Sequence, residues 1–311
     1  MLKVTNNLLK NEAERRGWKV EILSEAGGLL RYSLPSGKTV ILQSLTSPFT
    51  GAVSQKIADD KYTTYQLALQ AKVPVPETHI VKDKEESEEL LQKYKTVVIK
   101  PLDSAHGNGV TTNVTDSTKL ETAIEKARAF SDEVLLQPQL RGKDVRVLII
   151  GGELAACAQR RPASVVADGV STLGQLIVEE NKNPDRGENY QKKLNLIDEE
   201  VARNFLGDKI NEVPSKGETC TVVGTANIGT GGTAEDITEL VPEALIEASK
   251  KMLAVAGLPV GAADFMWDED SFYLLEINAN PSLGLHVYPT IGDSRPVHKL
   301  FLDWISTEAE R

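Results

Sequence analysis

The sequence predicts an α+β fold, because segments with helical periodicity alternate with short apolar segments typical of strands. The chain has 311 residues, of which 41% are hydrophobic and 26% charged, enough for a sizeable core in one large or two modest domains. It contains no internal repeat and no low-complexity tract. We therefore expect a globular protein of mixed helices and strands.

Residues 1–55 form the first part of this pattern. A helix is expected at residues 6–16. Short strands, separated by turns that contain glycine or proline, are expected at residues 19–23, 30–32 and 39–42. This stretch is too small for a complete nucleotide-binding unit, so we interpret it as a short N-terminal α/β segment before the main domain at residues 56–311.

The main domain continues the alternation. Between residues 59 and 140 the expected order is helix, strand, helix, strand, at residues 62–71, 96–99, 119–130 and 134–137. Further strands are expected at residues 145–150, 153–160, 219–223 and 272–277. Further helices are expected at residues 172–180, 198–206 and 242–256.

Three side chains with oxygen donors lie where two predicted strands could converge. Asp264 follows the small residues 261–263, while Glu276 and Asn278 are two residues apart on a strand and so share one face. Oxygen ligands suit Mg²⁺, which is usually held by one or two carboxylates together with water and substrate phosphates. Taken alone, Asp264 could cap a turn and Glu276 could pair with a lysine. The set as a whole indicates nucleotide chemistry.

Lys100 ends the apolar strand 96–99, where its ammonium group could meet a ligand. The loop that follows is rich in small residues, whose glycines allow close backbone approach and a nest of N–H groups over phosphates. Its candidate binding residues are Ser104, His106, Gly107, Asn108 and Gly109. No GK[ST] motif follows, so this is not a Walker A loop. A hairpin turn is the alternative for the loop alone, and a solvated lysine for Lys100 alone.

Composition excludes several classes of partner. The net charge of −10 disfavours nucleic acid, because phosphate neutralisation needs a basic face. The longest apolar runs fall short of the ~20 residues of a membrane span, and the opening residues lack the apolar core of a signal peptide. Cys157 and Cys220 have no CxxC spacing and are interpreted as reduced packing residues. We expect a cytoplasmic protein that binds neither nucleic acid nor membrane.

Six blocks carry a resemblance to a known family, in order between about residues 55 and 305. They are residues 98–101 with 106–112, 142–148, 160–163 with 165–172, 181–187, 230–234 and 276–281. They resemble the ATP-grasp superfamily, within it the branch that contains cyanophycin synthetase and the synthetase half of bifunctional glutathione synthetases. The resemblance implies two α+β lobes that enclose ATP, with a small lobe at about 95–140 and a mobile loop at about 224–236.

The resemblance also implies nucleotide-binding roles. Lys61 and Lys100 would bind the phosphates, and Gln137 would face the adenine amino group, where the family commonly has a glutamate. Asp144 matches the acidic position at the ribose hydroxyls, although a turn beside Gly142 would suit it as well. The expected nucleotide-binding set is Lys61, Lys100, Ser104, His106, Gly107, Asn108, Gly109, Gln137, Leu140 and Asp144.

Arg146, Arg160 and Lys100 form the expected catalytic set. The two arginines match family positions that face the phosphates or the substrate carboxylate, which a planar guanidinium binds at two points. Arg161, one residue further along the strand, should point away. His286 lies in a segment similar to the glutathione-synthetase-like members; it could lie near the amine substrate or be a structural hydrogen-bonding residue.

The implied cofactors are ATP and Mg²⁺. Two ions, for which Mn²⁺ could substitute, would be held by Asp264, Glu276 and Asn278. The glycine-rich residues 226–233 resemble the family's mobile loop and are expected to form a lid that excludes water, with a passive surface loop as the alternative.

We therefore expect an ATP-dependent carboxylate–amine ligase that joins amino acid or short peptide substrates through an acyl phosphate and releases ADP and phosphate. A glutathione-synthetase-like ligase that joins a dipeptide acid to glycine is the alternative within this class. A nucleotide-binding regulatory protein without turnover is the alternative outside it. A degenerate site should lose some of its metal ligands, so this alternative is disfavoured by the joint presence of Lys100, Arg160, Asp264, Glu276 and Asn278. The second halves of the two resembled enzymes are not recognised, so substrate identity stays open, and we allow for a homodimer.

Overall fold

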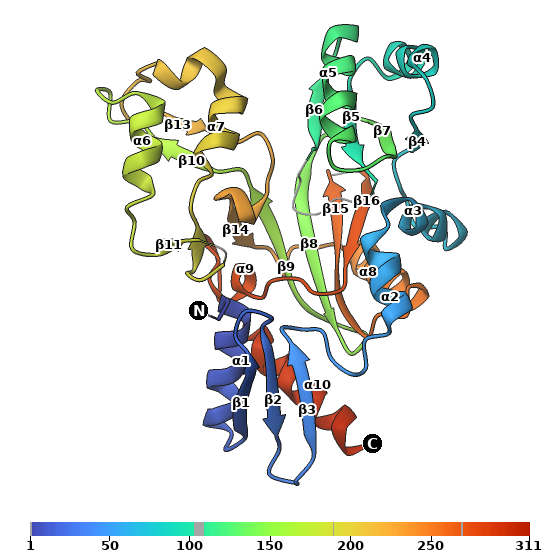
Figure 1. Cartoon of the computed structure of the whole chain (residues 1–311), viewed down its shortest axis with the longest axis vertical. Coiled ribbons are helices and arrows are strands. Elements are labelled where there is room, and N and C mark those ends of the chain that lie inside the picture. Colours follow the sequence, from blue (N-terminus) through green and yellow to red (C-terminus); the bar gives the residue numbers. More distant parts are fainter. Residues whose placement is uncertain (1, 103–108, 189, 269) are drawn as a thin grey trace.

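A five-stranded antiparallel sheet lies at the centre of the protein (Figure 1). The computed structural model describes residues 2–102, 109–188, 190–268 and 270–311. The strand order is β14-β9-β8-β15-β16. The strands are β8 (Lys143–Ile150), β9 (Glu153–Arg161), β14 (Thr233–Asp236), β15 (Val260–Trp267) and β16 (Phe272–Asn278).

The two faces of this sheet have different neighbours. Alternate residues of β8, such as Val145 and Val147, pack in a core with α8 (Glu243–Val255) and residues of α3 (Lys61–Gln70). Near α3, α2 (Ala52–Asp59) runs beside β16. On the opposite face, Leu148 and Ile150 pack against the N-terminal part of the chain. Asp144 and Arg146 lie on that same second face, which therefore changes from charged to apolar along one strand.

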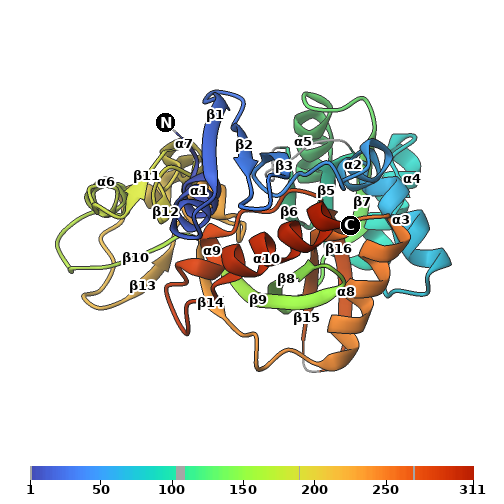
Figure 2. The same ribbon diagram turned by 90° about the horizontal axis from the view of Figure 1, so that it is seen from below.

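The N-terminal part of the chain is a three-stranded antiparallel sheet with two helices, which we call the N-terminal unit. Its strands are β1 (Lys19–Ser24), β2 (Leu29–Ser33) and β3 (Thr39–Gln43). The helices are α1 (Val4–Arg15) and, from the other end of the chain, α10 (Val297–Glu310). Figure 2 shows α10 crossing β8 and β9, which it contacts. The unit is thus completed by a helix that lies far from it in sequence.

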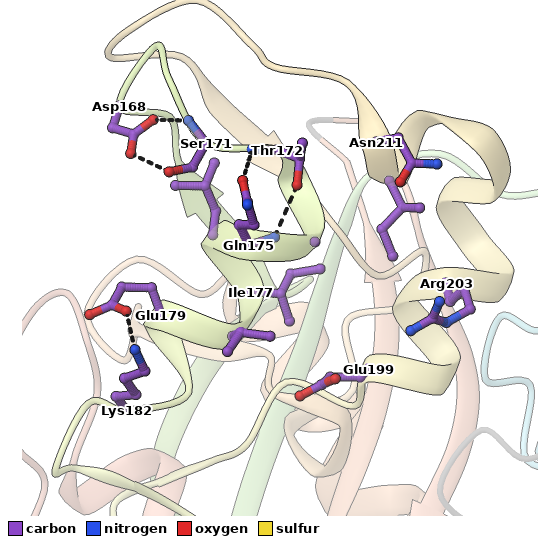
Figure 3. A pocket seen from close by; sticks show the side chains of 14 residues that line it. Asp168, Ser171, Thr172, Gln175, Ile177, Glu179, Lys182, Glu199, Arg203 and Asn211 are labelled. Atoms are coloured by element: carbon purple, nitrogen blue, oxygen red, sulfur yellow. Dashed lines mark hydrogen bonds and ion pairs between the residues drawn. The ribbon is translucent and has the colours of Figure 1, made fainter.

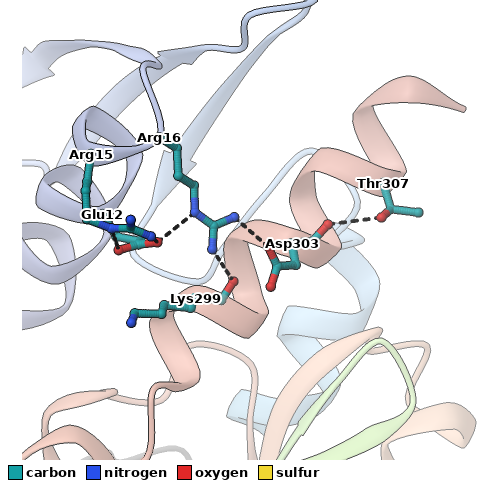
Figure 4. Close-up of polar contacts among 6 residues, drawn as sticks. All are labelled: Glu12, Arg15, Arg16, Lys299, Asp303 and Thr307. Carbon is teal, nitrogen blue, oxygen red and sulfur yellow. Dashed lines mark hydrogen bonds and ion pairs between the residues drawn. The ribbon is translucent and has the colours of Figure 1, made fainter.

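Charged side chains join α1 to α10 (Figure 4). Glu12 accepts hydrogen bonds from Arg15 at 2.7 and 2.8 Å and from Arg16 at 2.8 Å. The Arg15 guanidinium is the main cause that lowers the pKa of Glu12 to about 2, with Arg16 adding to it. Arg16 also donates to Asp303 at 2.6 Å and to the carbonyl of Lys299 at 3.1 Å. The first and last helices are therefore connected by ion pairs as well as by the apolar core.

A second, four-stranded sheet has the order β4-β7-β5-β6. Its strands are β4 (His79–Ile80), β5 (Val97–Pro101), β6 (Thr111–Val114) and β7 (Val134–Pro138). Helices α4 (Lys84–Tyr94) and α5 (Ser117–Arg128) supply Leu91 and Leu120 to its core. Lys100, on β5, is carried by this sheet.

Between β9 and β14 the chain forms a small separate region, residues 164–223, which we call the insert. Its elements are β10 (Ser164–Val166), α6 (Leu173–Glu180), β11 (Arg186–Gly187), β12 (Leu194–Asn195), α7 (Glu199–Leu206), η1 (Gly207–Asn211) and β13 (Thr219–Thr221). β10 pairs with β13, and the insert has its own apolar core. The short helices η2 (Ile228–Thr230) and α9 (Gly284–Val287) complete the fold.

The expected α+β class is confirmed, and most expected elements are present within a few residues of their expected ends. The strand expected at 219–223 ends at Thr221. No local pattern in the sequence predicted helices α2, α4 and α10 or the short strands β4, β6, β10, β11, β12 and β14. In the described part of the chain, no helix combines the length and apolar character needed to cross a membrane.

Candidate functional site

A row of charged residues crosses the five-stranded sheet. Asp264 on β15 lies directly opposite Arg146 on β8 and, on its other side, opposite Glu276 on β16. Continuing from Arg146, the row reaches Ala158 on β9 and then Asp236 on β14. Residues directly opposite each other on paired strands share one face. We call these five residues the charged row.

Two arginines bind the Asp264 carboxylate. Arg146 donates from Nε to Oδ1 at 2.7 Å and from Nη2 to Oδ2 at 2.6 Å. Nη1 of Arg160 lies 3.0 Å from Oδ2 of Asp264, and Nε of Arg160 donates to Asp144 at 2.6 Å. The Asp264 side chain is fully buried, and the two arginine side chains are 11% and 12% exposed. The geometry matches the charge-assisted, two-point binding that arginine offers to carboxylates.

Burial and charge compete at these carboxyl groups. Burial works to raise the pKa of Asp264, but Arg146 and Arg160 outweigh it, so the pKa lies below its ordinary value. At Asp144 burial prevails over the charge of Arg160, and the pKa is raised. Burial would lower the pKa of Arg160, but the charges of Asp264 and Asp144 raise it above its ordinary value. Arg160 therefore keeps its positive charge in a site of low exposure.

Lys100 lies on β5 of the four-stranded sheet and is close to the β16 end of the charged row, where Glu276 lies. Its side chain is buried, and burial lowers its pKa to about 8. The negative charge of Glu276 acts to raise that pKa, while Lys61, at the start of α3, acts to lower it. These electrostatic effects place Lys100 near both groups. Two of the expected lysines and one expected metal ligand thus come together from separate elements.

The other expected nucleotide-binding residues are spread around the four-stranded sheet. Gln137 on β7 is buried and donates its amide N–H to Thr78 at 2.6 Å, which turns its amide oxygen away from Thr78. Leu140 follows β7 and is partly buried. Gly109 has φ +73°, and a side chain there would meet Pro101 and Phe130 within 3 Å. Ser104, His106, Gly107 and Asn108 lie outside the described residues.

The three expected metal ligands are adjacent on one face. Asn278 donates from Nδ2 to Oδ2 of Asp264 at 3.4 Å, and Glu276 lies opposite Asp264. The described residues contain no group of three or more His, Cys, Asp or Glu side chains placed to hold a metal ion. Two carboxylates and one amide oxygen fit Mg²⁺ when phosphate oxygens and water complete its shell. Asp264 would then share its oxygens between the ion and the arginines.

The expected lid at 224–236 contains η2 and the edge strand β14, which pairs with β9. Gly231 has φ +94°, and a side chain there would come within 2.6 Å of the Ile197 backbone. A side chain at Gly232 would come within 2.7 Å of the Asn227 carbonyl oxygen. These two glycines permit close packing in the observed conformation. Movement of the segment stays a prediction.

Tyr190 and His286 complete the surroundings of the charged row. Tyr190 has φ +59°, unusual for a bulky residue; its N–H donates to Asn195 at 2.7 Å, and its carbonyl accepts from Val4 at 2.7 Å. Burial raises the pKa of Tyr190 above its ordinary value, although the positive charges of Arg146 and Arg160 act to lower it. No pattern in the sequence predicted a role for Tyr190. For His286 the sequence left two roles open, a place near the amine substrate or a structural hydrogen bond.

Two features lie away from the charged row. Arg161 points to the other side of β9, as expected, and pairs with Glu235 at 2.5 Å. A pocket of about 740 Å³ lies in the insert, between α6, α7 and η1 (Figure 3). Side chains at its wall pair with each other, as Asp168 does with Ser171 and Lys182 with Glu179. None of the expected site residues that the structure describes lines this pocket.

Two sheets, one carrying Lys100 and the other carrying the carboxylates and arginines of the charged row, define the class of protein: this is an ATP-grasp fold. Residues 64–176 match the family model "Prokaryotic glutathione synthetase, ATP-grasp domain". The chain therefore has the ATP-grasp fold, and over these residues it is similar to that family.

Particular relatives share more of the chain. It is 33% identical over 278 residues to cyanophycin synthetase from Trichormus variabilis, which covers 85% of this chain and 31% of that protein. It is 27% identical over 317 residues to a glutathione biosynthesis bifunctional protein from Desulfotalea psychrophila, covering 97% of this chain and 41% of that protein. The chain thus spans less than half the length of these relatives.

One solved structure extends the likeness to nearly the whole fold. The bifunctional glutathione synthetase from Pasteurella multocida matches 99% of this chain and 44% of its own, with a TM-score of 0.71 and 24% sequence identity. At this level of identity the likeness concerns the fold. It includes the N-terminal unit, which the expected core of the family did not cover.

Proposed function

We propose that the protein is an ATP-dependent carboxylate–amine ligase, which joins amino-acid-like or short peptide substrates through an amide bond and releases ADP and phosphate. One observation carries this proposal. Arg146 and Arg160 are fixed by Asp264 on a buried face of one sheet, and Lys100 approaches the same face from the other sheet. Fixed positive charge at low exposure is what phosphoryl transfer to a carboxylate needs.

The position of each lysine and arginine determines the role that we propose for it. Lys100 lies on the four-stranded sheet and Lys61 begins α3, which packs against the five-stranded sheet; both would bind phosphate oxygens. Arg146 uses Nε and Nη2 on Asp264, so Nη1 is the part of its guanidinium that would meet the substrate. Arg160 is held by two carboxylates and would neutralise the charge that develops as the phosphoryl group moves to the substrate carboxylate.

Asp264, Glu276 and Asn278 would hold Mg²⁺, which when bound neutralises phosphate charge. We propose two ions, with Mn²⁺ able to substitute because both prefer oxygen ligands. Gln137 would accept a hydrogen bond from the adenine amino group, because its amide nitrogen is already used on Thr78. Asp144 is proposed at the ribose, and Leu140, Gly109 and the residues 104–108 around the nucleotide.

The proposed organisation assigns the nucleotide to the region between the two sheets. Residues 1–55, together with α10, would form the N-terminal unit, and residues 224–236 would act as the lid. An ATP-consuming reaction and two unpaired cysteines, Cys157 and Cys220, suit the cytoplasm. A homodimer is compatible with this arrangement and is tested by measuring the mass in solution.

A glutathione-synthetase-like reaction, joining a dipeptide acid to glycine, is the second candidate. It is favoured by the extent of the match: the bifunctional relative covers 97% of this chain, whereas cyanophycin synthetase covers 85%. The sequence identity to this bifunctional relative is lower, 27% compared with 33% for cyanophycin synthetase. We therefore keep both substrate classes in the test below.

The test is incubation of the protein with ATP, MgCl₂ and separate pools of amino acids and dipeptides, with phosphate release and product mass measured. A ligase gives phosphate together with a new mass equal to two substrates less one water. The matched control is Asp264→Asn, which removes the charge that fixes both arginines. ATP binding without phosphate release in any pool would instead support a regulatory nucleotide-binding protein.

A further inference from the structure

His286 is a buried polar side chain for which the described part of the chain supplies no hydrogen-bond partner. It lies on α9, is 2% exposed, and neither ring nitrogen has a partner among the described residues. Burial, followed by the charge of Arg146, lowers its pKa to about 3. The ring is therefore neutral at ordinary pH, with one N–H donor and one acceptor nitrogen. Buried polar groups are nearly always paired, so this histidine requires an explanation.

The position of α9 places His286 over the charged row. Helix α9 contacts β9 and β14 (Figure 1), and Leu285 packs against Ala158 and Ala234. Ala158 belongs to the charged row, between Arg146 and Asp236. The small side chain at this position makes room where its neighbours in the row carry charged groups. His286 thus lies on the proposed reaction face of the sheet.

The backbone around His286 is held from both sides. Its N–H donates to the Leu283 carbonyl at 3.1 Å, and its carbonyl accepts from the Arg295 N–H at 2.9 Å. The Arg295 side chain is in turn bound to Asp236 at 2.7 Å and to Glu239 at 2.9 Å. The Leu283 N–H donates to Thr5 at 3.1 Å. The imidazole is therefore presented from a fixed backbone.

The charged groups that act on the ring already have partners. Arg146 and Asp264 bind each other, and Asp236 binds Arg295. His286 is therefore not needed as a counter-ion for any of them. A carboxylate or phosphate in this place would be bound by the arginines, which carry charge. A neutral imidazole instead suits an uncharged N–H group, from which its free nitrogen can accept a hydrogen bond.

We propose that His286 binds the amine substrate of the ligation by accepting a hydrogen bond from its N–H, so that the amine lone pair is directed at the activated carboxyl carbon. This inference rests on the proposed ligase function and assigns the residue that binds the amine substrate in that site. It concerns positioning of the nucleophile, in which orientation within hydrogen-bond distance raises the rate.

Hydroxylamine is the probe, because it attacks acyl phosphates as a small amine and gives a hydroxamate that iron(III) colours. The protein is incubated with ATP, MgCl₂ and pooled amino acids and dipeptides, and hydroxamate is measured against hydroxylamine concentration. The maximal rate reports activation of the carboxylate, and KM reports binding of the amine. His286→Asn and His286→Leu are compared with His298→Asn, a control at another histidine whose Nδ1 also lacks a partner.

We expect both His286 variants to raise KM for hydroxylamine about tenfold, the loss of roughly one hydrogen bond. Their maximal rate and KM for ATP should stay within about twofold of the parent, as should all constants of His298→Asn. His286→Leu should also raise the melting temperature, because an unpaired polar ring is replaced by an apolar side chain.

Two other outcomes are distinguishable. If the parent forms no hydroxamate at any hydroxylamine concentration, the ligase proposal fails and this inference fails with it. If the parent forms hydroxamate but the His286 variants keep the parental KM, or lose only the maximal rate, the ligase proposal stands and the role of His286 is overturned. Loss of folding in both His286 variants would likewise overturn it, in favour of a structural role.

Discussion

Arg146 and Asp264 face each other across β8 and β15 and share two hydrogen bonds of 2.7 and 2.6 Å, with Asp264 fully buried. Removal of one member of a buried ion pair leaves the other charge uncompensated, which is strongly destabilising. Here Asp264 is the ion-pair partner of both Arg146 and Arg160. The carboxylate therefore has a structural role in addition to its proposed role at the metal.

Asp264→Asn should lower the free energy of unfolding by about 3 kcal/mol. Denaturant unfolding measures this, and Glu235→Gln is the matched control, because it breaks the half-exposed pair with Arg161. The control should change stability by less than about 1 kcal/mol. Equal losses in the two variants would show that the central pair is no more important to the fold than a surface pair.

Glu276→Gln should leave the fold intact and reduce product formation by orders of magnitude, because it removes a charge where phosphate charge must be balanced. Glu276 lies opposite another carboxylate, Asp264, and its charge acts on buried Lys100, so its loss should cost less stability than Asp264→Asn, which leaves two arginines without their partner. Turnover at saturating MgCl₂ and the melting temperature are measured together. Near-normal turnover would reject Glu276 as a metal ligand.

The pKa of Lys100, lowered to about 8 by burial, predicts a pH dependence of nucleotide binding. As pH rises through that value in the free protein, the ammonium loses its proton, and kcat/KM for ATP should fall. Lys100→Arg, which keeps its charge, should lack this fall. A parental profile that stays flat well above pH 8 would contradict the assignment of Lys100 to the phosphates.

The stability should change in the opposite direction. A lysine whose folded pKa lies below its ordinary value of 10.5 destabilises the fold at low pH, and this penalty is relieved as pH rises from about 8 towards 10.5. Lys100→Met, which has no titrating group, is the reference. Its advantage in unfolding free energy over the parent should shrink across that interval.

Arg160 is predicted to act in transfer to the substrate carboxylate. With ¹⁸O in that carboxylate, one labelled oxygen should appear in the released phosphate; an acyl adenylate would put it in AMP. Arg160→Lys loses the planar group that binds Asp144 and Asp264 together, so turnover should fall while ATP binding is largely kept. Label in AMP rejects the mechanism, whereas a fully active Arg160→Lys rejects only the role of Arg160.

Limited proteolysis should distinguish a lid from a passive loop. We expect cleavage within residues 224–230 of the free protein, because residues 233–236 are paired in β14. A non-hydrolysable ATP analogue with Mg²⁺ should slow that cleavage if the segment closes. The β1–β2 turn at residues 25–28 is the internal control and should be cut at the same rate in both conditions. Slowing at both places would indicate an effect on the protease.

The sequence predicted local structure well and long-range pairing poorly, for physical reasons. The period of two on β8 placed Asp144 and Arg146 on one face. It could not show that Asp264, 118 residues away, would lie opposite Arg146, because that register depends on how two distant strands pair. The partners of the expected residues could therefore be identified only in the folded chain.

Some elements were not predicted because the residue pattern of their own segment is weak. Helix α4 is mostly polar and only two of its residues are buried, so no clear apolar stripe marks it. Strand β14 has four residues, and glycines precede it, which favoured a loop. Tyr190 has a positive φ, which no pattern in the sequence predicts, and its backbone is hydrogen-bonded to Asn195 and to Val4, which is distant in sequence.

The change from charged to apolar residues along one face of β8 limits how this protein can evolve. Substitutions at Arg146 or Leu148 each alter one side of the boundary between reaction site and core. Loss or gain of a single residue at the start of the strand, before Asp144, would turn every later side chain to the other face. Charged groups would then enter the core beneath α8 while aliphatic ones lined the site. Members of this lineage should therefore vary in length at the loops and the insert, and keep the length of β8 constant.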